Sequence, residues 1–209
     1  MAPRLAEAQA GQRAVFFVDA AHFVFAPFLG MVWCFERRFV KAPSGRQRLN
    51  VLAALHAITH EVLTVKNLTY ITAETVCELL ALLAGTYPDL PITIILDNAR
   101  YQRCIRVQTV AQTLGIELLY LPTYSPNLNL IERFWKFVKK QCLYSKYYPD
   151  STSFQQAIEA CIQQAPSTHK EALASLLTLR FQTFHAVPVI GEQHTVSQGS
   201  KEKVLSKAA

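Results

Sequence analysis

The sequence predicts an α/β domain in which a mixed five-stranded sheet carries helices on both faces. Short apolar runs and amphipathic segments alternate along the chain in the order β-β-β-α-β-α-β-α. The chain has 209 residues, of which 51% are hydrophobic, and this is enough to bury a sizeable core. No internal repeat or linker divides it, so we expect a single folded domain.

The expected strands are short, rich in β-branched and aromatic residues, and bounded by turn residues. They are placed at residues 14–20, 50–58, 62–65, 91–98 and 116–121. Residues 91–98 (PITIILDN) are apolar on both faces, as in a central strand that is covered from two sides. Residues 23–40 hold two further possible short strands, and residues 41–49 form a polar, basic turn.

The expected helices show apolar periodicity, and the first two end at Gly or Pro. The first begins near Ala73 and is closed by Gly85 and Pro88, and the second is ended by Gly115. The second and later helices are placed at residues 100–114, 129–143, 151–164 and 168–184.

The formal charge of +6 is concentrated in two segments that lack acidic residues. Residues 37–48 and residues 133–146 each hold five Lys or Arg. Such clusters suit a polyanion, most commonly nucleic acid, although a solvated surface has the same composition. The side chains expected to contact a DNA backbone are Arg46, Arg48, Arg133, Lys136, Lys139 and Lys140.

The composition argues against several other classes of protein. No uninterrupted apolar run has membrane-spanning length, and the N-terminal residues lack the apolar centre of a signal peptide, so we expect a cytoplasmic protein. The five cysteines are widely spaced without a C-x-x-C pair, which favours free thiols over disulfides or a zinc site. His56 and His60 form an H-x-x-x-H pattern, but Glu61 lies outside it, unlike in a zinc protease.

Two of the expected strands deliver an aspartate at or near their ends, Asp19 and Asp97. A carboxylate at the end of an apolar strand must be solvated, paired or bound to a metal. If the two strands are parallel neighbours, the carboxylates lie side by side and suit Mg²⁺ or Mn²⁺. Each Asp also has a simpler interpretation as a turn cap, and the sequence LDNA around Asp97 favours a turn.

Glu132 lies near the start of the helix expected at residues 129–143 and has two interpretations. Asn129 and Glu132 have the spacing of a capping box, and Lys136 is placed for an i,i+4 ion pair. Alternatively, an apolar stripe of this helix faces the sheet, and Glu132 at the sheet edge completes an Asp–Asp–Glu cage for two metal ions. The stripe consists of Ile131, Phe134, Trp135 and Val138.

Three segments resemble the catalytic motifs of DDE transposases. They are VDAAHF around Asp19, LDNARYQ around Asp97 and LPTYSPNLNLIERFWKFVKK around Glu132. More narrowly, they are similar to the mariner-related transposases of bacterial insertion sequences, in which 34 residues separate the last two acids, as residues 98–131 do here. The resemblance covers residues 13–185.

The resemblance implies a ribonuclease H-like fold in which Asp19, Asp97 and Glu132 bind two Mg²⁺ or Mn²⁺ ions. It implies that water cleaves a phosphodiester at the element's end, and that the freed 3′-hydroxyl then attacks target DNA. It also implies a homodimer or larger assembly that pairs two DNA ends in the bacterial nucleoid. His22 and Asn98 are further candidates for contacts around the metals, although each also fits a packing or turn role.

Two features depart from the family pattern. Full-length relatives carry an N-terminal helix-turn-helix region, whereas this chain starts just before the first catalytic strand, which implies half of a split reading frame or a truncated copy. A His that often follows the second Asp is replaced by the segment Tyr101–Arg103. We expect a catalytic domain at 13–185, a flexible lead-in at 1–12 and a disordered tail at 186–209. The alternatives are a silent remnant that only binds DNA or a partner subunit, and a host nuclease of the same fold.

Overall fold

The computed structural model describes residues 1–25, 35–36, 46–123, 125–144 and 146–181, and its centre is the predicted five-stranded mixed sheet. The strands are β1 (Ala14–Phe25), β2 (Gln47–His56), β3 (Val62–Asn67), β4 (Ile92–Leu96) and β5 (Ile116–Tyr120). Their order across the sheet is β3-β2-β1-β4-β5. The first three strands pair antiparallel, while β4 and β5 continue the sheet in parallel with β1.

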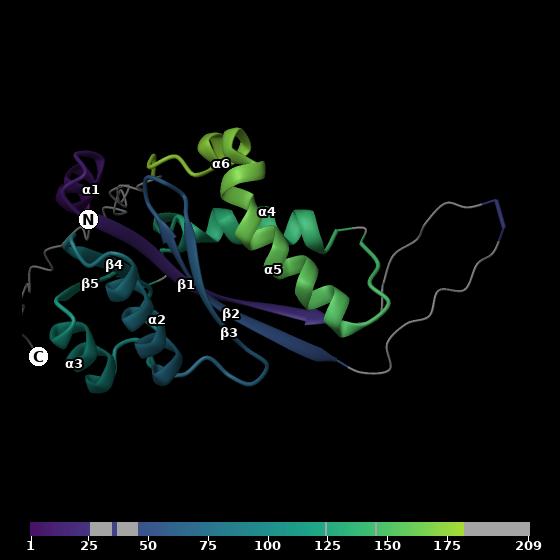
Figure 1. Ribbon diagram of the computed structural model, residues 1–209, viewed down its shortest axis with the longest axis horizontal. Coiled ribbons are helices and arrows are strands. Elements are labelled where there is room, and N and C mark those ends of the chain that lie inside the picture. Colours follow the sequence, from purple (N-terminus) through teal and green to yellow (C-terminus); the bar gives the residue numbers. More distant parts are fainter. Residues whose placement is uncertain (26–34, 37–45, 124, 145, 182–209) are drawn as a thin grey trace, which may run out of the picture.

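Helices cover both faces of the sheet, as predicted (Figure 1). One face carries α2 (Ala73–Thr86) and α3 (Ile105–Thr113). The other carries α4 (Ile131–Cys142), α5 (Ser151–Thr168) and α6 (Lys170–Leu176), and a short 3₁₀ turn (Pro126–Leu128) leads into α4. None of the described helices is long and apolar enough to cross a membrane.

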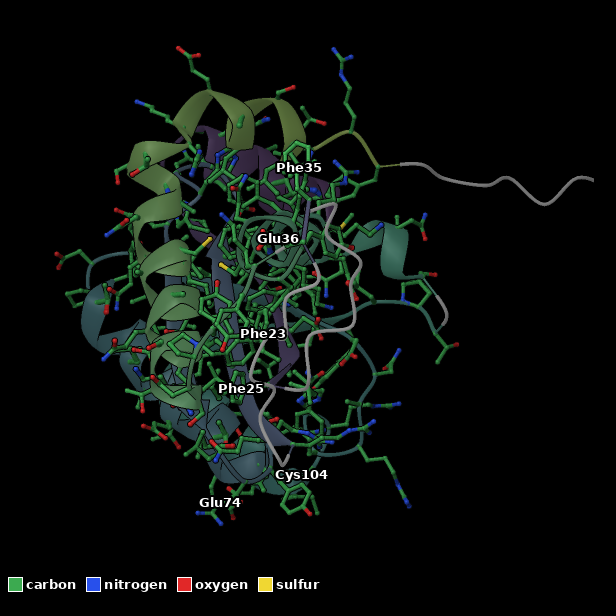
Figure 2. All side chains as sticks on the ribbon, turned by 90° about the vertical axis from the view of Figure 1, so that its right-hand side faces the viewer. Phe23, Phe25, Phe35, Glu36, Glu74 and Cys104 are labelled. Carbon is green, nitrogen blue, oxygen red and sulfur yellow. The ribbon has the colours of Figure 1, made fainter. Side chains whose placement is uncertain are left out.

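Alternate residues of β1 pack into two separate cores, because successive side chains of a strand point to opposite faces. Phe17 and Phe23 belong to the core under α4, α5 and α6, and Figure 2 shows Phe23 and Phe25 along this strand. Phe16 belongs to the core under α2 and α3. Asp19 is in phase with Phe17, so its side chain lies on the side of the sheet that α4 covers.

β1 is longer than the sequence predicts, since the antiparallel pairing with β2 continues to Phe25 opposite Gln47. The last helix is shorter than predicted, since α6 ends at Leu176. The second possible strand within residues 23–40, most of the basic turn at 41–49, and the expected tail at 186–209 lie outside the described residues.

Residues 2–9 form a helix, α1 (Ala2–Gln9), so the prediction of a flexible lead-in is wrong there. A network of ion pairs attaches this helix to the sheet. Arg4 Nε lies 2.8 Å from a carboxylate oxygen of Glu117 on β5, and Arg13 Nε lies 2.5 Å from Glu7. The contact of Arg4 with Glu117 joins residues 113 positions apart in the sequence, which explains why local composition does not indicate the helix.

Candidate active site

Asp19 and Asp97 lie at the same edge of the sheet because β1 and β4 are parallel neighbours. Phe17 pairs with Ile95 in the register of these strands. Asp19 comes two residues after Phe17, and Asp97 comes two residues after Ile95. The condition under which the sequence places the two carboxylates side by side, parallel pairing of neighbouring strands, is therefore met.

Glu132 reaches the same edge from the first turn of α4. The predicted apolar stripe of this helix is buried, with Phe134 fully buried and Trp135 2% exposed, whereas Lys136 is exposed. This packing holds Glu132 beside the strand ends. Together with Asp19 and Asp97 it lines one pocket of about 310 Å³.

The rest of the pocket wall is neutral. It is formed by Asn98, Ala99, Leu121, Pro122, Thr123, Ser125 and Asn129. Among the described residues that line it there is no Lys, Arg or His. Three carboxyl groups thus share a pocket without a protein cation in its described wall.

Glu132 has neither of the structural roles that its sequence context suggests. The prediction of a capping box is wrong, because α4 starts at Ile131 with Leu130 as its N-cap and has no side-chain cap hydrogen bond. Asn129 instead donates from Nδ2 to the carbonyl oxygen of Val18, at 3.4 Å. Across the residues that the structure places, Glu132 forms no salt bridge, so the expected pair with Lys136 is absent.

Burial and, to a smaller extent, the neighbouring charges of Glu132 and Asp97 raise the pKa of Asp19 to about 7. The backbone of Ala20 and the indole N–H of Trp135 favour the charged form and act in the opposite direction. Trp135 Nε1 is buried and makes no hydrogen bond of normal length, so its effect on Asp19 is weak. Asp19 is therefore largely protonated below neutral pH when no cation is present.

Asp97 and Asn98 shape the opposite wall. Asp97 Oδ1 accepts a hydrogen bond from the backbone N–H of Ala99 at 3.2 Å, which is the turn interaction that the sequence LDNA favours. Asn98 donates from Nδ2 to the carbonyl oxygen of Leu121 and so ties the end of β4 to the end of β5. Asp97 thus caps a turn and also lines the pocket.

The pocket fits a hard divalent cation by its chemistry, since its polar groups are mainly carboxylate, amide and hydroxyl oxygens. Its geometry is not preassembled, because no three His, Cys, Asp or Glu side chains in the described parts of the chain are close enough to hold one ion. The three acids would have to move together around an ion.

All six predicted DNA-contacting cations are exposed or half-buried. Arg46 and Arg48 are exposed at the start of β2, and Lys136 and Lys140 are exposed on the outer side of α4. Lys139 is half-buried.

Arg133 is engaged within the protein instead. Its guanidinium group donates to the carbonyl oxygens of Thr178 at 2.8 Å and Arg180 at 2.9 Å, and more weakly to Leu176 at 3.4 Å. It also lies over the ring of Phe181, 5.8 Å from the ring centre. Arg133 therefore fastens the segment after α6 to the start of α4.

The sequence predicts one residue near the metals, His22, that lies apart from the pocket, and it does not predict Tyr101 beside the acids. His22 is exposed, and its Nδ1 lies 2.7 Å from Asn50 Oδ1, away from the pocket-lining residues. In the sequence Tyr101 is only a departure from the family pattern, yet burial and the charges of Asp97 and Asp19 raise its pKa to about 12. The sequence carries no signal that places Tyr101 beside the acids, other than its closeness to Asp97.

Comparison with known proteins agrees with this geometry. A family model for the DDE superfamily endonuclease matches residues 14–155. The chain is similar to the crystal structure of the Mos1 strand transfer complex, with 14% identity and a TM-score of 0.50 over 85% of this chain and 58% of that chain. The strand order and this similarity show the ribonuclease H-like fold that the motifs imply.

A second match is the cryo-EM structure of the simian T-cell lymphotropic virus intasome in complex with PP2A regulatory subunit B56 gamma. It has 14% identity and a TM-score of 0.47 over 71% of this chain and 48% of that chain. The chain thus spans about half the length of the chains in these two structures. A search of curated proteins found no significant match.

Replacement of Asp19 by Asn should stabilise the metal-free protein at high pH. The folded-state pKa of about 7 lies above the usual 3.8, so ionisation of Asp19 opposes folding increasingly as the pH rises from 4 to 7. In EDTA at pH 8, we expect the free energy of unfolding of Asp19→Asn to exceed that of wild type by on the order of 2 kcal/mol. Chemical denaturation at pH 4.5 and pH 8 tests this, and an advantage that fails to grow with pH would contradict it.

Replacement of Arg133 by Ala should lower the free energy of unfolding by about 1–2 kcal/mol, because the variant loses hydrogen bonds from a charged donor to three carbonyl oxygens. Lys136→Ala, three residues further along α4 and exposed, is the matched control and should change it by less than about 0.5 kcal/mol. Urea denaturation compares the two variants. Equal effects would mean that the Arg133 contacts contribute nothing to stability.

Proposed function

The chain belongs to the family of DDE superfamily endonucleases, and we propose that its residues 13–185 are the catalytic domain of a DNA transposase of a bacterial insertion sequence. The observation that carries the proposal is the single pocket lined by Asp19, Asp97 and Glu132. These acids come from three separate elements, and Glu132 has no capping or ion-pair role in the described structure that would explain its position. Strand transfer is the reaction named for the Mos1 complex, which has a similar fold.

The proposed reaction is two successive displacements at phosphorus. First, a water oxygen bonds to phosphorus while the bond to the 3′ oxygen breaks, which leaves a 3′-hydroxyl and a 5′-phosphate. Then this hydroxyl attacks a phosphorus of target DNA, which releases its own 3′ oxygen. Mg²⁺ or Mn²⁺, held as two ions by Asp19, Asp97 and Glu132, would make the attacking oxygen more acidic and stabilise the leaving oxygen.

The exposed cations give the DNA a path across the protein. Lys136 and Lys140 are exposed one and two turns after Glu132 on nearly the same face of α4. Arg48 pairs with Val24, five residues beyond Asp19 along β1, which is roughly 17 Å at 3.3 Å per residue. That distance corresponds to about five base pairs, so Arg48 contacts phosphates well away from the cleaved bond.

The proposed partners follow from this reaction. They are the terminal repeats of the element, the target DNA, and a second copy of the chain, because two ends must be joined. A helix-turn-helix region that recognises the ends, as in full-length relatives, is a further expected partner. A cytoplasmic, nucleoid-associated location agrees with such partners.

Cleavage of DNA should depend on all three acids and on a divalent ion. The substrate is a labelled duplex with the terminal repeat from the DNA that flanks the gene, incubated with Mg²⁺ or Mn²⁺. We expect Asp97→Asn and Glu132→Gln to reduce cleavage at least about a hundredfold, because each removes a ligand to ions that contribute several kcal/mol. Asn67→Ala, which removes three side-chain hydrogen bonds away from the pocket, is the folding control.

The same assay separates the alternatives. Wild-type cleavage that survives both substitutions would overturn the roles of Asp97 and Glu132. Wild type that binds the duplex but never cuts it, even when a helix-turn-helix half is added, would favour a silent remnant that only binds DNA.

DNA binding should lose salt dependence when the outer lysines of α4 are removed. Lys136→Ala combined with Lys140→Ala should reduce the slope of log K against log salt by about 2, because each phosphate contact contributes about 0.9. Arg133→Ala is the matched control on the same helix and should leave the slope unchanged, since its donors are bound to backbone carbonyls. Titration of a fluorescent duplex at several salt concentrations measures the slopes. An unchanged slope in the double variant would place the DNA elsewhere.

A further inference from the structure

Asn129 has a buried polar atom that the three acids do not explain. The residue is 4% exposed and lines the pocket with Asp19, Asp97 and Glu132. Its Nδ2 donates to the carbonyl oxygen of Val18 at 3.4 Å, whereas its Oδ1 is buried and has no hydrogen-bond partner among the described residues. A buried amide oxygen without a partner costs about 1–3 kcal/mol.

The contact with Val18 determines which end of the amide is left unpaired. A backbone carbonyl only accepts hydrogen bonds, so it selects the amide nitrogen and leaves the oxygen for another partner. Val18 directly precedes Asp19 on β1, and Asn129 lies three residues before Glu132. The side chain therefore bridges the two elements that carry these acids.

The neighbouring donors in the structure do not supply the missing partner. Ser125 Oγ donates to the carbonyl oxygen of Thr123 at 3.4 Å, and Trp135 Nε1 is itself unpaired. The described wall has no basic side chain. A cation, or a water that a cation binds, is the kind of group that would satisfy an amide oxygen here.

We infer that Asn129 contributes a fourth oxygen to the ligand shell of the divalent ions that Asp19, Asp97 and Glu132 hold. The inference rests on the proposed function and extends the metal site beyond the three acids. In the ion-free protein a neutral amide is less costly at this position than a fourth carboxylate, because it adds an oxygen without adding to the repulsion among the three acids.

The test measures Mn²⁺ binding without DNA, by isothermal titration of the whole chain. Asn129→Ala removes the oxygen and should weaken Mn²⁺ binding about tenfold, the lower end of the loss seen when groups around a metal are removed. Asn129→Asp keeps an oxygen but loses the donor to Val18, and it should bind Mn²⁺ at least as well as wild type. Asn67→Ala loses the bond to the carbonyl of Tyr70 (2.9 Å) and the two that its Oδ1 accepts from Asn50 and Thr69, all away from the pocket, and should leave Mn²⁺ affinity unchanged.

Circular dichroism first establishes that each variant is folded at the titration temperature. An equal loss of Mn²⁺ affinity in Asn129→Ala and Asn129→Asp would overturn the inference, because it would show that Asn129 acts only through its bond to Val18. Unchanged affinity in Asn129→Ala would also overturn it. If wild type binds no Mn²⁺, the proposed metal site itself is overturned. If wild type binds Mn²⁺ and Asp97→Asn loses this binding while Asn129→Ala keeps it, only this inference is overturned.

Discussion

The candidate site depends on one constraint, which is that three carboxyl groups are held at a sheet edge with no protein cation in the described pocket wall. Parallel pairing of β1 with β4 brings two of them together, and packing of α4 against the sheet adds the third. Repulsion and burial oppose this arrangement, as the raised pKa of Asp19 shows. Burial of Phe134 and Trp135 supports it, at about 1.5–3 kcal/mol for a large apolar side chain. Hydrophobic packing thus keeps like charges together in the absence of an ion.

Consecutive side chains at the start of α4 have different tasks, because each is rotated by about 100° from the one before it. Glu132 faces the pocket, whereas the next residue, Arg133, binds the carbonyl oxygens after α6. Lys136 lies one turn after Glu132 on nearly the same face of the helix, and it is exposed and does not line the pocket. The Arg133 contacts fasten the segment that follows α6 beside the first turn that carries Glu132. A basic cluster in a sequence therefore need not be a uniform DNA surface, since one of its cations is used to support the position of the acid next to it.

The fold could be predicted where the local hydrophobic pattern determines each strand or helix. The site could be predicted where its residues lie at the ends of predicted strands. The order of strands and helices, the buried stripe of α4, and the meeting of Asp19 with Asp97 all follow from periodicity and parallel pairing. Contacts between residues far apart in the sequence could not be predicted: the amide of Asn129 caps no helix because it binds Val18, 111 residues away. The position of His22 could not be predicted either, because the expected strand ends at residue 20. In the structure β1 continues to Phe25, and the odd separation of His22 from Asp19 puts the two side chains on opposite faces of the strand.

The contact between Asn129 and Val18 also explains how the strand and the helix start stay together. No side-chain cap fixes the first turn of α4, and the charges of Asp19 and Glu132 push β1 and α4 apart. The hydrogen bond from Asn129 crosses this gap one residue from Asp19 and one helical turn from Glu132, so neither acid moves away without breaking it. The same bond leaves the amide oxygen unpaired. The unpaired oxygen and the repulsion therefore have a common origin, and a single cation in the pocket would relieve both.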